Sequence, residues 1–172
     1  MSIAKRVENY LSQRNIHYKL IPHSHTDNSR DTARSANIAA GHLAKAVILQ
    51  DEEGVYLMAV IPANNKVRLF KVNLELDRHF HLVSEKPLQE LFPDCEWGAI
   101  PALGQAYGMD ILWDNKLQAG TDLYLEAGSH EDLIKIKLKD FIQLMGESPH
   151  ADISEDSVFY SPYHSDEIRD YL

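Results

Sequence analysis

The sequence predicts an α+β fold in which helices surround a curled sheet of mixed or antiparallel strands. Apolar, β-branched runs dominate the middle of the chain, amphipathic segments lie around them, and no internal repeat is visible. A length of 172 residues is enough to bury a core, and the single cysteine excludes an internal disulfide. We expect one domain over residues 1–147, followed by an acidic tail with little fixed structure over residues 148–172.

The individual elements follow from residue spacing and from turn residues. Apolar residues three and four apart indicate helices, whereas short β-branched or alternating runs bounded by Gly and Pro indicate strands. Glu53 and Gly54 separate two such runs and indicate a hairpin with largely buried strands. The expected helices cover Ser2 to about Asn15, 32–38, 73–78, a segment from Ser84 to Pro93, and 138–145. The expected strands cover 17–22, 43–51, 55–62, 79–83, 109–114, 121–128 and 130–137.

Charge and hydropathy narrow the function classes. The net charge of −9 argues against a general nucleic-acid binder with a broad basic face, and no DNA partner is expected. No apolar run approaches the length of a membrane span, and the first residues carry no signal-peptide pattern. We therefore expect a cytoplasmic protein without a membrane partner. Glycine-rich nucleotide loops and the G-x-S-x-G motif are also absent from the sequence.

Lys45 is the most informative single residue. It lies in the apolar run L-A-K-A-V-I-L (43–49), with no other Lys, Arg, Asp or Glu from residue 35 to residue 50. Burial lowers the pKa of a lysine and a nearby anion restores it, so an ammonium group on a rigid strand can bind a phosphate, a carboxylate or an oxyanion. The alternative is a strand lysine whose stem extends to water.

The loop E-W-G-A-I-P-A-L-G (96–104) is the second candidate feature. Gly98 permits a positive φ or a close approach to a ligand, and Pro101 and Gly104 restrict the exit of the loop. Backbone N–H groups in such a loop can bind a carbonyl oxygen. A plain connector is the alternative.

The histidines and the cysteine are weaker indicators of a functional site than Lys45 and the loop 96–104. H-x-H pairs start at His23 and His79, but no metal-binding helix motif accompanies them, so neither a metal nor another cofactor is expected. A metal hydrolase built on the histidines is a third hypothesis. His130 precedes a strand and is a candidate for orienting a substrate. Cys95 is flanked by acids, which raise the pKa of a thiol and disfavour a cysteine nucleophile.

Several segments together resemble the YbaK/prolyl-tRNA-synthetase-associated domain family, which comprises the editing domain of bacterial prolyl-tRNA synthetases and its free-standing relatives. The resemblance runs from about Tyr18 to Met145, and its segments follow the order of the family. They are Y-K-L-I-P-H-S-H-T (18–26), G-H-L-A-K-A-V-I-L (41–49), Y-L-M-A-V-I-P-A (56–63), L-F-P-D-C-E-W-G-A-I-P-A-L-G (91–104), A-Y-G-M-D-I-L-W-D (106–114) and Y-L-E-A-G-S-H-E-D-L-I (124–134). The resemblance implies an α+β fold with a curled mixed sheet and hydrolysis of the ester bond in mischarged aminoacyl-tRNA.

The resemblance also implies site residues and their roles. The strand lysine of the family falls on Lys45, which would hold the terminal adenosine phosphate or the ester region. The glycine–proline substrate loop falls on Gly98, Ala99, Ile100 and Pro101, whose backbone N–H groups would stabilise the oxyanion while a water molecule attacks. Trp97 departs from the glycine pair of many deacylases and narrows or reshapes the amino-acid pocket. The expected substrate-binding residues are His25, Thr26, Thr32, Trp97 and His130.

The expected function is that of a trans-editing hydrolase, an aminoacyl-tRNA deacylase that supports translation fidelity. Its partners would be aminoacyl-tRNA and an aminoacyl-tRNA synthetase. The alternative is a non-catalytic module of the same fold that binds tRNA or a synthetase, and Trp97 and the acidic net charge motivate it. Ala46 stands where family members that clear alanine have asparagine, so the aminoacyl group that is removed stays open.

Overall fold

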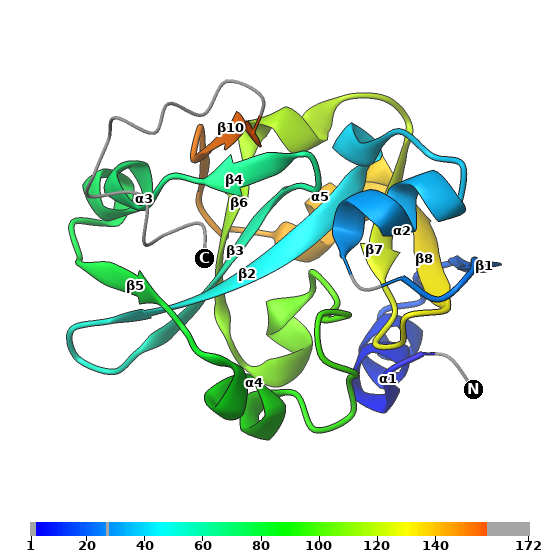
Figure 1. Cartoon of the computed structure of the whole chain (residues 1–172), viewed down its shortest axis with the longest axis horizontal. Coiled ribbons are helices and arrows are strands. Elements are labelled where there is room, and N and C mark those ends of the chain that lie inside the picture. The colour runs from blue at the N-terminus through cyan, green and yellow to red at the C-terminus, as the bar shows by residue number, and fades with distance from the viewer. Residues whose placement is uncertain (1–2, 27, 158–172) are drawn as a thin grey trace.

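The fold is built around one mixed sheet. A computed structural model of the chain describes residues 3–26 and 28–157, and its main sheet there has eight strands in the order β1-β8-β7-β2-β3-β6-β9, with β5 also paired to β2 (Figure 1). Strands β4 and β10 form a second, small sheet. The strands are β1 Lys19–Pro22, β2 Leu43–Asp51, β3 Tyr56–Pro62, β4 Asn65–Val67, β5 Phe80–Leu82, β6 Asp110–Asp114, β7 Asp122–Glu126, β8 Asp132–Lys137, β9 His150–Ala151 and β10 Ser154–Asp156. The expected α+β fold with a mixed sheet is confirmed.

The α-helices of the described residues lie around this sheet. They are α1 Lys5–Gln13, α2 Ser29–Ser35, α3 Leu69–Leu76, α4 Glu85–Leu91 and α5 Leu138–Met145. α1 forms because Val7 and Leu11 recur on one face and are buried, while its expected cap, Ser2, lies outside the described residues. α2 begins three residues earlier than expected, because the Asn28 side chain accepts a hydrogen bond from the N–H of Asp31 and caps the helix. No helix in the described part of the chain has the length and apolarity needed to cross a membrane.

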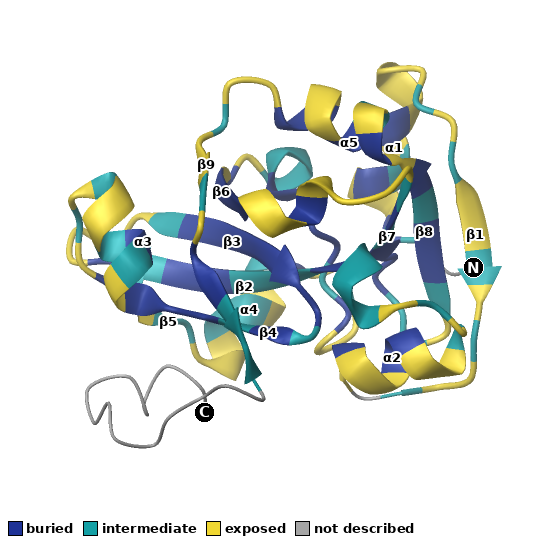
Figure 2. Ribbon diagram, turned by 90° about the horizontal axis from the view of Figure 1, so that it is seen from above, coloured by how far each residue is buried: buried dark blue, intermediate teal, exposed yellow. Residues whose placement is uncertain are grey.

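β2 and β3 form the predicted hairpin at the centre of the core. Ala44 and Ile48 of β2 belong to the larger apolar cluster, whereas Leu49 and Leu57 belong to a second cluster on the other side. Figure 2 shows burial concentrated along β2, β3, β7 and β8 and exposure on the outer sides of the helices. Burial on both faces explains why β3 is a continuous apolar run and why Lys45 is the one charge that interrupts the run L-A-K-A-V-I-L of β2. The second cluster also includes Leu69, and α3 therefore begins four residues earlier than expected.

The edge of β2 that lies opposite β3 is paired with other strands at its two ends and is unpaired between them. Next to β3, the strand is paired along almost its whole length. On its other side, β2 pairs in parallel with β7 only at Leu43 and Ala44, and antiparallel with β5 from Leu49 onward. The segment 45–47 has no strand on this side within the described residues, so its backbone faces an open space. We call this segment the open edge of β2.

The segment 148–157, called here the C-terminal strap, was expected to lack fixed structure, and this expectation is wrong. β9 pairs in parallel with β6, and β10 pairs antiparallel with β4. Polar anchors hold the strap: the buried Asp114 carboxylate accepts hydrogen bonds from the Ser154 hydroxyl and the Ile153 N–H, and Arg68 pairs with Glu155. The rest of the expected tail, residues 158–172, lies outside the described residues.

Candidate functional site

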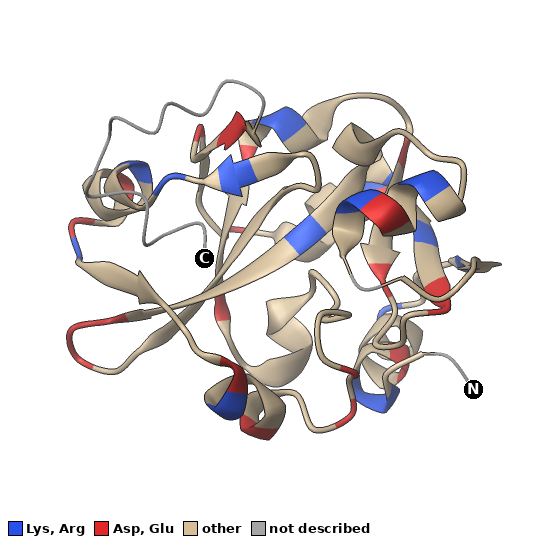
Figure 3. Cartoon of the chain, viewed as in Figure 1, with Lys and Arg blue, Asp and Glu red and all other residues tan. Residues whose placement is uncertain are grey.

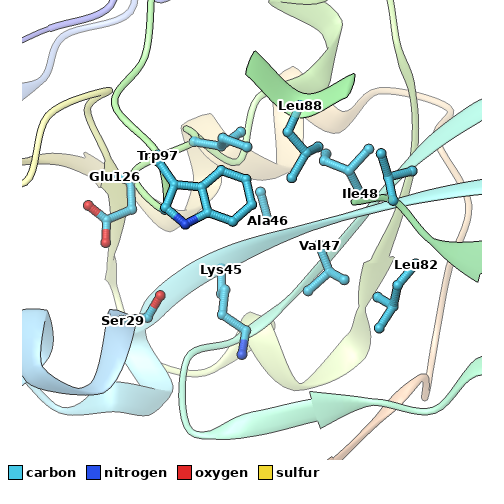
Figure 4. Close-up of a pocket in the computed structure, with 12 residues that line it drawn as sticks. Ser29, Lys45, Ala46, Val47, Ile48, Leu82, Leu88, Trp97 and Glu126 are labelled. Carbon is cyan, nitrogen blue, oxygen red and sulfur yellow. The ribbon is translucent and has the colours of Figure 1, made fainter. Parts of the chain in front are cut away.

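A pocket of about 220 Å³ lies against the open edge of β2 (Figure 4). β2 forms its floor, and the loop 96–104 contributes the wall that carries Trp97. Figure 4 shows Leu82 and Leu88 at one end of the pocket and Ser29 and Glu126 at the other. The pocket thus has an apolar end and a polar end. The lining residues are Ser29, Lys45, Ala46, Val47, Ile48, Leu82, Val83, Leu88, Trp97, Gly98, Ile100 and Glu126.

Lys45 lies on the open edge, and its amine turns away from Trp97 towards β4 (Figure 4). The Nζ atom donates a hydrogen bond to the carbonyl oxygen of Asn65 at 3.3 Å. Burial, together with the positive charges of Lys66 and Arg30, lowers the pKa of Lys45 to about 8. Figure 3 shows basic positions on β2, β4 and α2 on the same face of the molecule. An anion that binds there would be attracted by three basic side chains and would favour the charged form of Lys45.

The loop 96–104 divides into residues that line the pocket and residues that hold the loop. Gly98 has φ +82° and lines the pocket together with Ile100 and Trp97. Ala99 and Pro101 are buried, and the N–H of Ala99 donates to the carbonyl oxygen of Glu96 at 3.1 Å. In the described part of the chain, no hydrogen bond uses the N–H of Gly98 or of Ile100. Among the loop residues that line the pocket, the N–H groups of Gly98 and Ile100, like that of Trp97, are thus candidate donors to a ligand, whereas Pro101 has no N–H to donate.

The other expected substrate-binding residues lie outside the pocket lining. The hydroxyls of Thr26 and Thr32 are hydrogen-bonded at 2.6 Å. The ring centroids of His25 and His130 lie 5.0 Å apart, and the backbone N–H of His130 donates a hydrogen bond to the Glu96 carboxylate. Of these residues, Thr32 is near the pocket, because its hydroxyl is close enough to the Glu126 carboxyl group to lower the pKa of that group. The structure therefore brings Lys45, Trp97, Gly98 and Ile100 together at one pocket, and places His25 and His130 elsewhere.

Sequence reasoning missed Glu126. It is the last residue of β7, it is 3% exposed, and burial raises the pKa of its carboxyl group to about 8. The parallel pairing of β2 with β7 ends where Ala44 pairs with Leu125, and the next residues of the two strands, Lys45 and Glu126, both line the pocket. The available signal was an acidic residue at the end of the apolar strand Y-L-E, but the sequence does not show that this strand ends beside Lys45.

The remaining chemistry-bearing groups have structural partners. Burial raises the pKa of the Cys95 thiol to about 12, and its Sγ lies 3.2 Å from the Tyr107 hydroxyl, which donates to Asp94. A thiol in this environment is a poor nucleophile. No group of three or more His, Cys, Asp or Glu side chains suited to a metal ion occurs within residues 3–26 and 28–157.

Comparison with known structures places the fold among solved relatives. A hypothetical protein, APE2540, superposes with a TM-score of 0.77 at 19% identity, covering 88% of this chain and 100% of that one. A candidate trans-editing enzyme for prolyl-tRNA synthetase gives 0.74 at 20% identity, covering 88% and 96%. A candidate signal-transduction protein from Marinobacter aquaeolei VT8 gives 0.72 at 22% identity, but only 32% of that chain is covered. At these identities the likeness shows the fold alone.

The sequence itself identifies the family. No curated protein matches the chain. The model of the aminoacyl-tRNA editing domain, in contrast, matches residues 23–144, which include β2, the loop 96–104 and β7. The match covers well over half of the chain and contains every residue of the pocket lining. On this evidence the chain belongs to the aminoacyl-tRNA editing domain family.

Proposed function

We propose that this protein is a trans-editing aminoacyl-tRNA deacylase, which hydrolyses the ester bond between a wrongly attached amino acid and its tRNA. The observation that carries the proposal is that Lys45 and the loop residues Gly98 and Ile100 line one pocket, in a chain of the editing family. The fold shared with a candidate trans-editing enzyme supports the same class of reaction. Such a protein acts in the cytoplasm, with aminoacyl-tRNA and a synthetase as partners.

Lys45 has the role of an anion anchor in this proposal. The net charge of the chain is −9, so a polyanionic tRNA needs a local positive field. Lys45, Arg30 and Lys66 are close enough for the last two to lower the pKa of the first. A phosphate of the terminal adenosine, or the polarised ester, would be drawn to this cluster. Lys45 binds that group and keeps its own proton once the anion is present.

The loop 96–104 supplies the transition-state contacts. Water attacks the ester carbonyl carbon, the carbonyl oxygen becomes an oxyanion, and the bond to the ribose oxygen then breaks as that oxygen takes up a proton. The N–H groups of Gly98 and Ile100 donate to the oxyanion, a contribution of about 3–4 kcal/mol per donor in well-studied cases. No side-chain nucleophile is required, which agrees with the unreactive environment of Cys95.

The size of the pocket sets the selectivity. A space of about 220 Å³ admits a small aminoacyl group, and Trp97 forms part of its wall. Size discrimination by one methylene group contributes only about 1–3 kcal/mol, so a synthetase that must reject a smaller amino acid benefits from a second, smaller site. We infer that the excluded group is the larger, correct amino acid.

The test is the release of amino acid from a panel of mischarged tRNAs. We expect the Lys45→Ala variant to lower kcat/KM about 100-fold or more, because the anion anchor is lost. Lys139→Ala, at an exposed position of α5, is the matched control and should keep full activity. Unfolding curves of both variants establish that the fold is retained. Equal activity of Lys45→Ala and the wild type would contradict the proposed role.

The same panel distinguishes the enzyme from a binding module. A module that recruits tRNA or a synthetase would show saturable binding and no turnover of any mischarged tRNA. Trp97 motivates this alternative, because it stands at the pocket with 48% of its surface exposed. Turnover at an enzyme concentration far below that of the substrate eliminates it.

A further inference from the structure

Glu126 is a buried acid in the pocket wall that the proposed hydrolysis does not use. Its side chain is 3% exposed, and it lines the pocket together with Lys45 and Gly98. With Ser29, it closes the end of the pocket opposite Leu82 (Figure 4). A carboxyl group at such a place is costly unless its hydrogen bonds are made, so its partners need to be identified.

The chain does not supply all of the hydrogen bonds that this carboxyl group can make. The Thr32 hydroxyl lies beside the carboxyl group and lowers its pKa, but it donates its proton to the carbonyl oxygen of Asn28. The Oε2 atom of Glu126 is enclosed and has no hydrogen-bond partner within the described residues. No cation contributes to the pKa of Glu126, although Lys45 lines the same pocket, because the Lys45 amine turns towards Asn65 instead. The polar end of the pocket therefore presents a carboxyl group that lacks both a donor and a countercharge.

An α-amino acid has the chemistry that complements this arrangement. It offers an ammonium group, which supplies up to three donors and a positive charge, next to a side chain that suits the apolar end around Leu82 and Leu88. We propose that Glu126 binds the α-ammonium group of the aminoacyl ester and so selects esters that carry a free amine. This inference rests on the proposed function, because it places the aminoacyl end of the tRNA in this pocket.

The protonation states are compatible with such a pair. Burial raises the pKa of the empty Glu126 carboxyl to about 8, and a free α-amino group has an ordinary pKa of about 7.7–8.0. The two groups can therefore share one proton near neutral pH, whichever of them carries it before binding. In the bound state, Oε2 gains the partner that it lacks and the substrate amine is not left without an acceptor.

The test compares two small analogues that differ in the amine alone. The probes are 3′-alanylamino-3′-deoxyadenosine and the 3′-lactoylamino compound, in which a hydroxyl replaces the ammonium group; both have an amide in place of the ester and are not hydrolysed. We expect the wild type to bind the alanyl analogue about tenfold more tightly in an NMR or calorimetric titration. In Glu126→Gln this preference should fall below twofold. Glu131→Gln, at an exposed acid just before β8, should retain it.

A second pair of variants tests Glu126 without removing it. Thr32→Val removes the hydroxyl that lies beside the carboxyl group, and Thr32→Ser keeps it. We expect the preference for the alanyl analogue to weaken in Thr32→Val and to be restored in Thr32→Ser. A purely structural role of Glu126 would change stability but leave the ratio of the two affinities untouched.

The outcomes separate this inference from the proposed function. Three outcomes would overturn the assignment to Glu126. They are a preference for the alanyl analogue that is retained in Glu126→Gln, the absence of that preference in the wild type, and failure of the wild type to bind either analogue. Deacylation that depends on Lys45 would still stand in those cases. Conversely, a Glu126-dependent preference without turnover of any mischarged tRNA would support amine recognition and remove the hydrolase.

Discussion

Charged groups are buried both beneath the C-terminal strap and at the pocket, but the two regions differ in how many hydrogen-bond and ion-pair partners these groups have. Beneath the strap, Asp114 is fully buried and accepts hydrogen bonds from Ser154, Ile153 and the N–H of Lys116. Arg68, 6% exposed, is paired with a carboxylate of the strap, that of Glu155. The chain itself thus supplies hydrogen-bond donors to Asp114 and an ion-pair partner for Arg68, which make burial of these charges tolerable.

At the pocket, the corresponding groups are incompletely satisfied. Within the described residues, Lys45 has a single hydrogen bond, to a carbonyl oxygen, and two neighbouring cations disfavour its charge. Glu126 has an enclosed oxygen without a donor. The strap thus uses buried charge to fix the fold, whereas burial of two titratable groups at the pocket lowers stability. A cost of this kind is expected where a ligand completes the hydrogen bonds.

Removal of the Asp114 carboxylate should have a large effect on the stability of the C-terminal strap. Asp114→Ala removes an acceptor of three hydrogen bonds and leaves the N–H groups of Ile153 and Lys116 without it. We expect the free energy of unfolding to fall by about 3–4 kcal/mol, measured by urea denaturation. Asp110→Ala, at the exposed start of β6, is the matched control and should change stability by less than about 0.5 kcal/mol. Similar small losses in both variants would mean that the strap is not held by this carboxylate.

The pH dependence of the unfolding free energy should show that Lys45 and Glu126 reduce stability. The pKa of Lys45 in the folded chain, about 8, lies below its ordinary 10.5, so the unfolded chain binds the extra proton and stability rises from about pH 8 to 10.5. The pKa of Glu126, about 8, lies above its ordinary 4.5, so the folded chain binds the extra proton and stability falls from about pH 4.5 to 8. Together they predict that the contribution of the pocket to stability is lowest near pH 8.

The measurement is the unfolding free energy against pH for the wild type and two variants. Lys45→Met should remove the alkaline rise and Glu126→Gln the acid-to-neutral fall, each on the order of 2 kcal/mol after solvent screening. Both variants should be at least as stable as the wild type at pH 8. A Lys45→Met variant that is less stable at neutral pH would show that the lysine is structurally satisfied, like the charges beneath the strap.

The same contrast explains which parts of the fold the sequence could predict. The hairpin of β2 and β3 was predictable because its apolar, β-branched runs are continuous and its turn residues are local. The strap was not, because its acids resemble a solvated tail until they meet Arg68, Lys71 and Lys116, which are distant in the sequence. A pairing over such separations leaves no periodic signal in the strap itself.

The site was predictable to a similar extent. Lys45 stood out because it is a lone charge in an apolar run, and the loop around Gly98 because of its glycine and proline. The family resemblance assigned all four residues 98–101 alike, whereas the structure separates Gly98 and Ile100, which line the pocket, from Ala99 and Pro101, which are buried. Glu126 depends on where β7 stops pairing with β2, and only the three-dimensional register shows that.

A smaller effect is expected at the pocket, where neighbouring cations shift the pKa of Lys45 and no carboxylate pairs with it within the described residues. Arg30 lowers the pKa of Lys45 through its positive charge, so Arg30→Gln should raise that pKa. If Lys45 must be protonated to bind the tRNA end, the alkaline limb of the kcat/KM profile should move up by about 0.3 pH unit, after subtraction of spontaneous ester hydrolysis. Arg34→Gln, one turn further on α2 and highly exposed, does not contribute to the pKa of Lys45 and should leave the limb in place. A limb that stays fixed in Arg30→Gln while kcat/KM falls at every pH would instead make Arg30 a direct phosphate contact, since losing a binding charge weakens affinity without changing the proton equilibrium of its neighbour.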